Sequence, residues 1–240
     1  MPASVVDSDA KTANSGAVTS KSFTAQANDL IVIGAFGGYT MAAAMALGDG
    51  TVADGGGSYG TDQVGDTGSA PPKNCALKIG QRFLTAAGSY TFTAQSSNEV
   101  VAFFLLIRGA LTSGALDGYN ISATGQGTGL QAVTSASLTP SAGVTDDLLI
   151  NFAGLVQFVG ATTWTPPSGM TEVADASSPN GWVSAEVATQ ALASSAATGT
   201  KTATSTRASG DTINGVAQSA ILIRSAPAVT ATGRMLLAAP

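Results

Sequence analysis

Histidine is absent from this chain of 240 residues, and cysteine occurs once, at Cys75. Without histidine, neither a Ser–His–Asp triad nor a typical catalytic zinc site can be assembled. A single cysteine also excludes an intramolecular disulfide and a cysteine-built zinc site. We therefore interpret Cys75 as a small residue of a strand or of the core.

Charged residues are scarce as well, at 10% of the chain against about 25% in ordinary soluble domains. Only three Glu and five Lys are present. Exposed helix faces depend on these residue types, so a mainly helical protein is excluded. The ten Lys and Arg residues are scattered singly and the net charge is −5, which argues against a nucleic-acid partner.

Long hydrophobic runs are missing too. The longest strictly apolar run is Val100–Ile107, whereas a membrane-spanning helix needs about 20 residues. The N-terminal segment has neither the basic start nor the continuous apolar stretch of a secretory signal. We expect a soluble protein without an export signal and without a membrane partner.

Two halves of the chain resemble each other in sequence. Asn28–Phe36 (NDLIVIGAF) recurs as Asp146–Gly154 (DDLLINFAG) at an offset of 118, and Phe104–Ala110 (FLLIRGA) recurs as Ala220–Ala226 (AILIRSA) at an offset of 116. Ordered matches at a nearly constant offset indicate a repeat. We interpret them as an internal duplication, with a first unit at residues 1–110, a second at 111–226 and a C-terminal arm at 227–240.

Within each unit, short apolar segments are separated by turn-forming residues, and several segments alternate with a period of two. In Cys75–Phe83 and Val183–Gln190, we expect one set of side chains to point inward and the other, which includes Glu186, to face solvent. The pattern predicts an all-β fold of two tandem β-sandwich domains, jelly-roll-like or alternatively immunoglobulin-like. The one helix that we expect is Thr40–Leu47 (TMAAAMAL).

Carboxylates are the remaining candidates for catalysis. Asp146 and Asp147 stand directly before an apolar segment, as Asp29 does in the first unit. We interpret these residues as polar caps at the start of a strand. A carboxylate-based glycosidase, which needs two such groups facing each other across a cleft, is kept as an alternative function.

A glycine-rich segment of the first unit carries four more aspartates: Asp49, Asp54, Asp62 and Asp66. Oxygen ligands in a loop suit Ca²⁺, but the spacing matches no calcium motif, so a solubilising loop is the favoured interpretation.

The two tryptophans give a third possibility. Trp164 precedes a Pro–Pro turn and Trp182 precedes an alternating segment. Exposed aromatic rings stack on sugars, so a carbohydrate-binding adhesin or receptor-binding module is an alternative function. We favour an interpretation in which Trp182 packs in the sandwich and Trp164 braces the turn. No catalytic, cofactor-binding or metal site is assigned.

The second half resembles segments of bacteriophage virion proteins. The resemblance is carried by Asp147–Gly154 (DLLINFAG), Thr163–Glu172 (TWTPPSGMTE), Trp182–Thr189 (WVSAEVAT) and Ser219–Arg224 (SAILIR). It implies a head-decoration (capsid cement) or tail-associated protein with β-sandwich domains and no catalysis. The first half departs from the pattern, because it lacks the Trp/Pro–Pro turn and carries the Asp/Gly-rich segment instead.

These observations together predict a non-enzymatic subunit that works through its surface. We expect a homo-oligomer of the virion, assembled in the host cytoplasm, whose partners are copies of itself and major capsid or tail proteins. The arm at 227–240 carries Met235, Leu236 and Leu237, and we predict that it adds a strand to a neighbouring subunit. A frayed chain end is the alternative interpretation of this arm.

Overall fold

The computed structural model describes residues 2–38, 46–49, 60–66, 75–96, 98–124, 127–128, 131–141, 146–157, 162–206 and 212–227. These residues form strands and turns, and none of them lies in a helix that could cross a membrane. The all-β class predicted from the sequence is therefore confirmed.

The strands of the first half are β1 (Ser4–Ala13), β2 (Gly16–Thr19), β3 (Phe23–Ala25), β4 (Leu30–Gly38), β5 (Ala46–Asp49), β6 (Gly60–Asp66), β7 (Cys75–Phe83), β8 (Gly88–Tyr90), β9 (Phe92–Ser96) and β10 (Val100–Arg108). Those of the second half are β11 (Leu116–Thr124), β12 (Gly127–Thr128), β13 (Gln131–Ser135), β14 (Leu148–Gln157), β15 (Thr163–Thr165), β16 (Thr171–Ser177), β17 (Val183–Ala191), β18 (Lys201–Thr206) and β19 (Thr212–Ile223).

Each half contains one large and one small antiparallel sheet. In the first half the large sheet has the order β1-β10-β4-β7-β6 and the small one β2-β9-β5, with the pair β3-β8 beside it. In the second half the orders are β11-β19-β14-β17-β16, with β12 also on β19, and β13-β18-β15. We leave out β3, β8 and β12 and number the remaining strands of each half from 1 to 8 along the chain. In both halves the large sheet then has the strand order 1-8-3-6-5 and the small sheet the order 2-7-4. Strands 1 and 2 lie in different sheets, as in a jelly roll, whereas an immunoglobulin domain keeps them in one sheet.

The two halves match in further detail. Asn28 and Asp146 precede equivalent strands, and they are the non-glycine residues with positive φ in the described part of the chain, at 70° and 69°. The two edge strands also carry a bulge at the same place, after Val5 in β1 and after Leu116 in β11. Duplication remains our interpretation of this correspondence, and the domain boundary that we predicted falls between β10 and β11.

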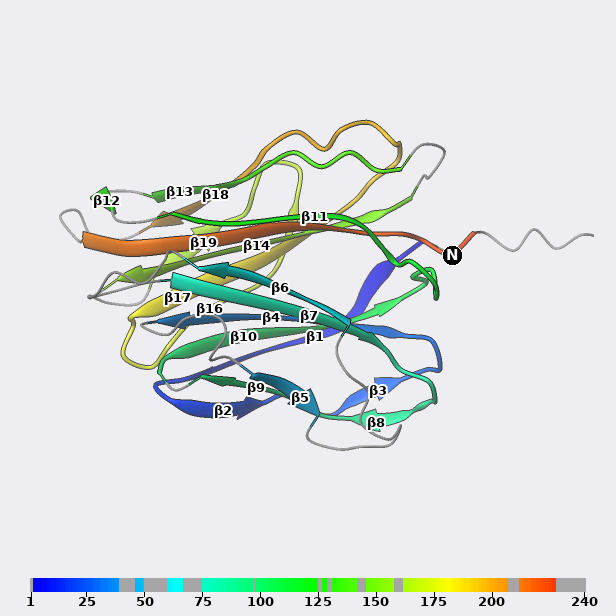
Figure 1. Ribbon diagram of the computed structural model, residues 1–240, viewed down its shortest axis with the longest axis horizontal. Helices are drawn as coiled ribbons and strands as arrows, with labels where there is room; N and C mark the ends of the chain where they lie inside the picture. The colour runs from blue at the N-terminus through cyan, green and yellow to red at the C-terminus, as the bar shows by residue number, and fades with distance from the viewer. Residues whose placement is uncertain are drawn as a thin grey trace, which may run out of the picture.

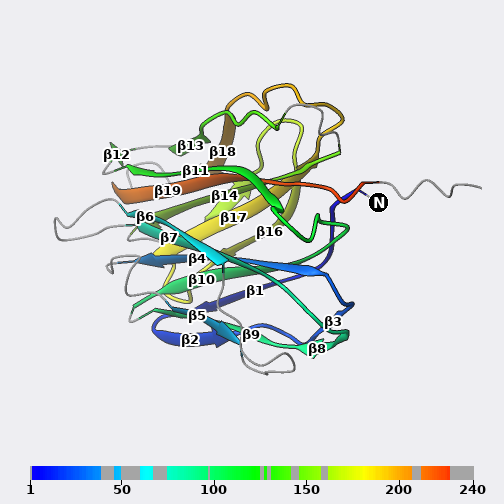
Figure 2. The ribbon, with the colours of Figure 1, turned by 45° about the vertical axis from the view of Figure 1, so that its right-hand side comes forward.

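The sheets are stacked in four layers, with the two large sheets face to face in the middle and the small sheets outside (Figures 1 and 2). The most extensive cluster of buried apolar side chains lies between the large sheets and draws on both halves, from Leu30 and Phe103 to Phe152 and Ile221. Smaller clusters fill the interior of each sandwich. The two units therefore share a core, which the sequence did not reveal.

Close packing between the large sheets depends on two glycines. A Cβ atom at Gly34 in β4 would overlap the ring of Phe152 in β14, and one at Gly154 would overlap the ring of Phe36. Leu30 and Leu148 hold the same register position in their sheets, so Gly34 is equivalent to Phe152 and Phe36 to Gly154. Each ring thus occupies the space that a glycine leaves open on the opposite sheet.

This layered arrangement corrects the prediction for Val183–Gln190. Ser184 and Glu186, expected to face solvent, are both 0% exposed. The alternation does separate two faces of β17, but the outer face of the large sheet is covered by the small sheet of the same half. Both faces are therefore buried.

The predicted helix Thr40–Leu47 is also corrected in part. Ala46 and Leu47 belong to β5, which pairs with β9, so no helix reaches Leu47. Residues 40–45 lie outside the described ranges.

Candidate functional site

The carboxylate before β4 is buried and pairs with a half-buried arginine. Arg108, the last residue of β10, donates from Nε to Asp29 Oδ1 at 2.9 Å and from a terminal nitrogen to Oδ2 at 2.7 Å. Asp29 is 2% exposed and its Oδ2 also accepts from the backbone amide of Gln26 at 2.8 Å. The hydrogen bond to Asp29 raises the pKa of Arg108. Asp29 therefore makes the polar contact expected at the start of a strand, while its ion pair with Arg108 was not predicted.

The equivalent residues of the second half are arranged differently. Arg224, the counterpart of Arg108, pairs with Asp117 in the bulge of β11, at 3.1 Å from Nε to Oδ1. Ser141 donates to the same carboxyl from its amide and its hydroxyl, each at 2.5 Å. Burial alone would raise the pKa of Asp117, but the Ser141 hydrogen bonds and the charge of Arg224 outweigh it, so the pKa is lowered.

Asp147, the counterpart of Asp29, is consequently left without its own cation. It is 1% exposed, and neither oxygen of its carboxyl makes a hydrogen bond of good geometry. Burial raises its pKa most and the charge of Asp117 adds to that effect, while the nearby Ser225 amide and the charge of Arg224 offset it only in part. Asp117 and Asp147 therefore form a carboxyl pair in which Asp147 is the group that holds a proton more readily.

A second group of carboxylates lies on β16 and β17. Glu186 is 0% exposed and neither of its carboxyl oxygens has a hydrogen-bond partner. Asp175 lies directly opposite it in the strand pairing, and Glu172 pairs with Ala188 on the same face. Burial, with smaller contributions from the charges of Glu172 and Asp175, raises the pKa of Glu186 to about 8. Glu186 is therefore mostly protonated at neutral pH.

Of the two tryptophans, Trp164 is buried and Trp182 is half-buried. Trp164 is 6% exposed, belongs to the buried cluster of the second sandwich and donates from Nε1 to Ser184 Oγ at 2.9 Å. It therefore packs in the sandwich, the position that we had predicted for Trp182. Trp182 directly precedes β17 and is half-buried, and its amide donates to Asn180 Oδ1 at 3.1 Å.

The aspartates of the glycine-rich segment fall largely outside the description. Asp49 ends β5, while Asp62 and Asp66 belong to β6, but their side chains lie outside the described part, as does Asp54 altogether. No group of three or more Cys, Asp or Glu side chains among the described residues is placed to hold a metal ion. The calcium interpretation of this segment stays a hypothesis.

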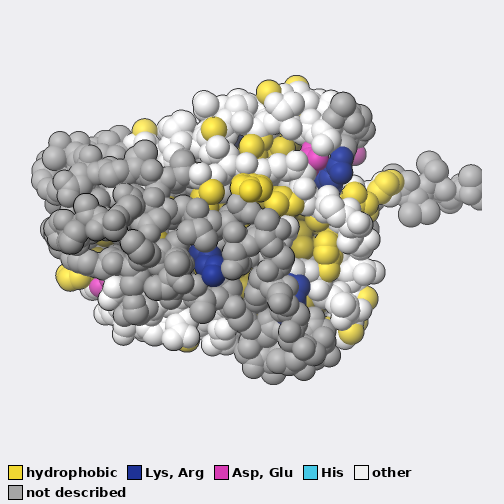
Figure 3. Space-filling view, in the orientation of Figure 1, with side chains coloured by type: hydrophobic (Ala, Val, Ile, Leu, Met, Phe, Trp, Pro, Cys, Tyr) yellow, Lys and Arg dark blue, Asp and Glu magenta, His cyan; other side chains and the backbone are white. Residues whose placement is uncertain are grey.

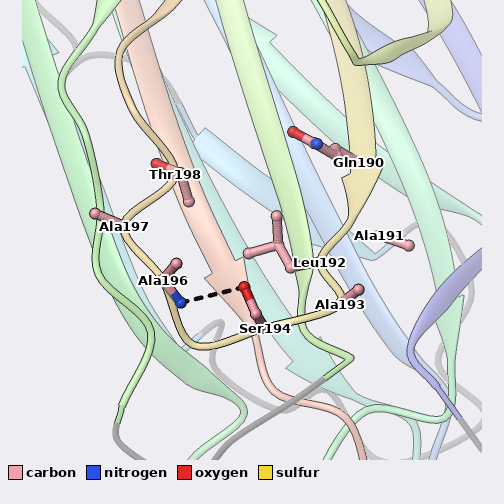
Figure 4. A pocket seen from close by; sticks show the side chains of 8 residues that line it. All are labelled: Gln190, Ala191, Leu192, Ala193, Ser194, Ala196, Ala197 and Thr198. Atoms are coloured by element: carbon pink, nitrogen blue, oxygen red, sulfur yellow. Dashed lines mark hydrogen bonds between the residues drawn. The ribbon is translucent and has the colours of Figure 1, made fainter.

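Two shallow pockets are formed by described residues. One, of about 300 Å³, follows the connection from β17 to β18 and is lined by Gln190, Leu192, Ser194 and Thr198 with neighbouring alanines (Figure 4). The other, of about 470 Å³, lies between β1 and the ends of β16 and β17, where Val5, Thr171 and Gln190 contribute. No acidic or basic side chain lines either pocket. The buried carboxyls therefore do not face each other across either of these pockets, as a glycosidase would require.

The sequence did not predict the contacts of the buried carboxyl groups or of the two arginines. The repeated Arg108 and Arg224 were visible at the end of each repeat, but their partners were not, because Arg224 meets the bulge residue Asp117, where the first half has Val6. Cys75 is buried at the start of β7, which agrees with its interpretation as a small residue of a strand or of the core. Comparison of the chain with protein-family models, with curated proteins and with solved structures found no match.

Proposed function

We propose that this protein is a non-enzymatic structural subunit of a phage particle, either a head-decoration (capsid cement) protein or a tail-associated protein. The observation that carries the proposal is the four-layer stack, in which two sandwiches share one apolar core across their large sheets. Sharing a core makes the two sandwiches a single stiff body. A particle subunit needs such stiffness, because it transmits contacts from one neighbour to the next.

The surface supports the same role. Among the described residues, Val6 and Tyr119 are the exposed large hydrophobic side chains, at 43% and 45% exposure. The face shown in Figure 3 carries few acidic or basic side chains in its described part. Short, uncharged side chains lose little conformational freedom when they are buried against a neighbour. Such a surface favours contact between subunits.

The buried carboxyls support a structural role over hydrolysis. Asp29 and Asp117 each hold an arginine and a neighbouring backbone amide, and Glu186 lies inside the second sandwich away from solvent. Each therefore ties strands together or sits in the core. The buried ring of Trp164 offers no face to a sugar, so the adhesin alternative loses one of its two aromatic candidates.

The test is fractionation of phage particles from a culture that produces this protein. Particles are banded in a density gradient, and peptides of the chain are quantified by mass spectrometry against an abundant host cytosolic protein as the contamination control. We expect the chain to band with the particles in a fixed ratio to the major capsid protein. Presence at or below the level of the host control would overturn the proposal. Immunogold labelling of the banded particles then distinguishes a head from a tail position.

A further inference from the structure

The outer edge of β11 is an open edge of the second large sheet. β11 is nine residues long and lies at the end of the order β11-β19-β14-β17-β16. In the part of the chain that the structure describes, no strand pairs with its outer side. An edge strand presents unpaired backbone amide and carbonyl groups, which another strand can take up.

The equivalent edge strand of the first half, β1, carries several charged side chains. β1 carries Asp7, Asp9 and Lys11, and Lys21 approaches Asp7 with its Nζ at 2.6 Å from Oδ1. Lys11 lies 3.4 Å from Asp9. Charged side chains on an edge strand oppose pairing with a second chain, because pairing would bring them together or strip them of water.

β11 lacks this protection. Its single charged residue, Asp117, is turned inward with a side chain 2% exposed and holds Arg224 and Ser141. Tyr119 is 45% exposed, and Ile121 on the same face is half-buried. An uncharged edge with a large aromatic side chain suits strand pairing.

We propose that β11 pairs antiparallel with β11 of a second copy about a two-fold axis at Asn120, so that the large sheets of two second halves become one continuous sheet. The proposal deepens the subunit role proposed above by naming one contact between copies. Asn120 is the central residue of Leu116–Thr124, and a register centred there uses all nine residues of both strands. The same register places Tyr119 opposite Ile121 of the other copy, an aromatic and β-branched cross-strand pair. A second copy also brings no unpaired charge to this edge.

Site-directed cross-linking tests the register. In an Asn120→Cys variant of the full chain, the two new thiols lie directly across the axis, within reach of a disulfide or of a very short thiol cross-linker. A Gly118→Cys variant is the matched control, because the two copies of residue 118 lie about 13 Å apart in this register. A Cβ atom at Gly118 makes ordinary contact with Leu222, so the control tolerates its substitution. The native Cys75 is buried and contributes little background.

The expected result is a covalent dimer from Asn120→Cys at least tenfold more abundant than from Gly118→Cys. Absence of the dimer from Asn120→Cys, or equal yields from the two variants, overturns the proposal. Absence of the Asn120→Cys dimer is also expected if β11 pairs with a strand of a different protein.

Sedimentation velocity provides a second, independent reading. Tyr119→Lys places a charge on β11, and Ser8→Lys places the same charge at the equivalent position of β1. We expect the wild type and Ser8→Lys to sediment as oligomers of equal mass, and Tyr119→Lys to sediment at a lower mass with an unchanged circular dichroism spectrum. An unchanged mass for Tyr119→Lys overturns the proposal. Particle fractionation tests the virion role separately. The β11 contact can therefore be refuted while the virion role is supported, and the virion role can be refuted while the β11 contact is supported.

Discussion

The buried carboxyl of Glu186 predicts a stability that falls as pH rises. In the folded chain its pKa is raised to about 8 from the ordinary value of 4.5, because the group is fully buried and unpartnered. Between these two values the folded state binds more protons than the unfolded state. Stability is therefore present in full below about pH 4.5 and is lost progressively as pH rises through 8.

The magnitude follows from the size of the shift. Each pKa unit corresponds to about 1.4 kcal/mol, so a change from 4.5 to about 8 amounts to about 5 kcal/mol between the low-pH and high-pH limits. At pH 7 roughly two thirds of that loss, about 3 kcal/mol, has already occurred. This is a large part of the 5–15 kcal/mol by which a typical domain is stable.

The perturbation is Glu186→Gln, which keeps the shape and removes the titration. Urea unfolding at pH 5, 7 and 9 is followed by the fluorescence of Trp164, which is buried in the same sandwich. We expect the free energy of unfolding of the wild type to fall from pH 5 to pH 9 by several kcal/mol more than that of the variant. Glu172→Gln, on the exposed rim, is the control and should keep most of the wild-type slope. Equal slopes for the wild type and Glu186→Gln would refute the reasoning.

Further predictions concern the shared core and the two ion-pair positions. Phe152→Ala empties the space opposite Gly34 and should lower the free energy of unfolding by about 3–5 kcal/mol in urea titrations; a loss below about 1 kcal/mol would contradict the packing described. Asp29→Asn breaks the two hydrogen bonds to Arg108 and should lower the Tm, whereas Asp147→Asn removes a carboxyl without its own cation and should leave the Tm unchanged or raise it. The opposite ranking in thermal unfolding would count against the geometry. A fragment of residues 1–110 exposes its side of the shared core and should bind a hydrophobic dye and aggregate, while the full chain does neither; a monomeric fragment without dye binding would contradict this.

The fold class could be predicted from the sequence because it depends on patterns within short segments. The alternation in Cys75–Phe83 and the scarcity of Glu and Lys are both properties of short segments, which reflect single strands and turns. The repeated NDLIVIGAF and DDLLINFAG segments likewise marked β4 and β14 at equivalent places. Such signals need no knowledge of how the sheets are stacked.

The environment of the carboxyls was not accessible in the same way. Glu186 was expected in solvent because alternation tells which residues share a face, and not how many layers cover that face. Arg224 was seen as a repeat of Arg108, yet its partner is Asp117, the bulge residue of β11, where the equivalent bulge of β1 has Val6. Bulges and layer contacts are set by tertiary structure, so they leave little trace in a single sequence.

The exchange of glycine and phenylalanine between β4 and β14 has a consequence for how identical chains avoid one another during folding. If the large sheets of two first halves met, two Gly34 positions would leave an empty space while two Phe36 rings would collide. Two second halves would meet the same conflict, so each sheet accepts only its unlike counterpart. Exchange of unlike halves between two chains is the one mispairing left open. The short connection Gly109–Ala115 opposes it, because it keeps the correct counterpart at a far higher local concentration than any other chain.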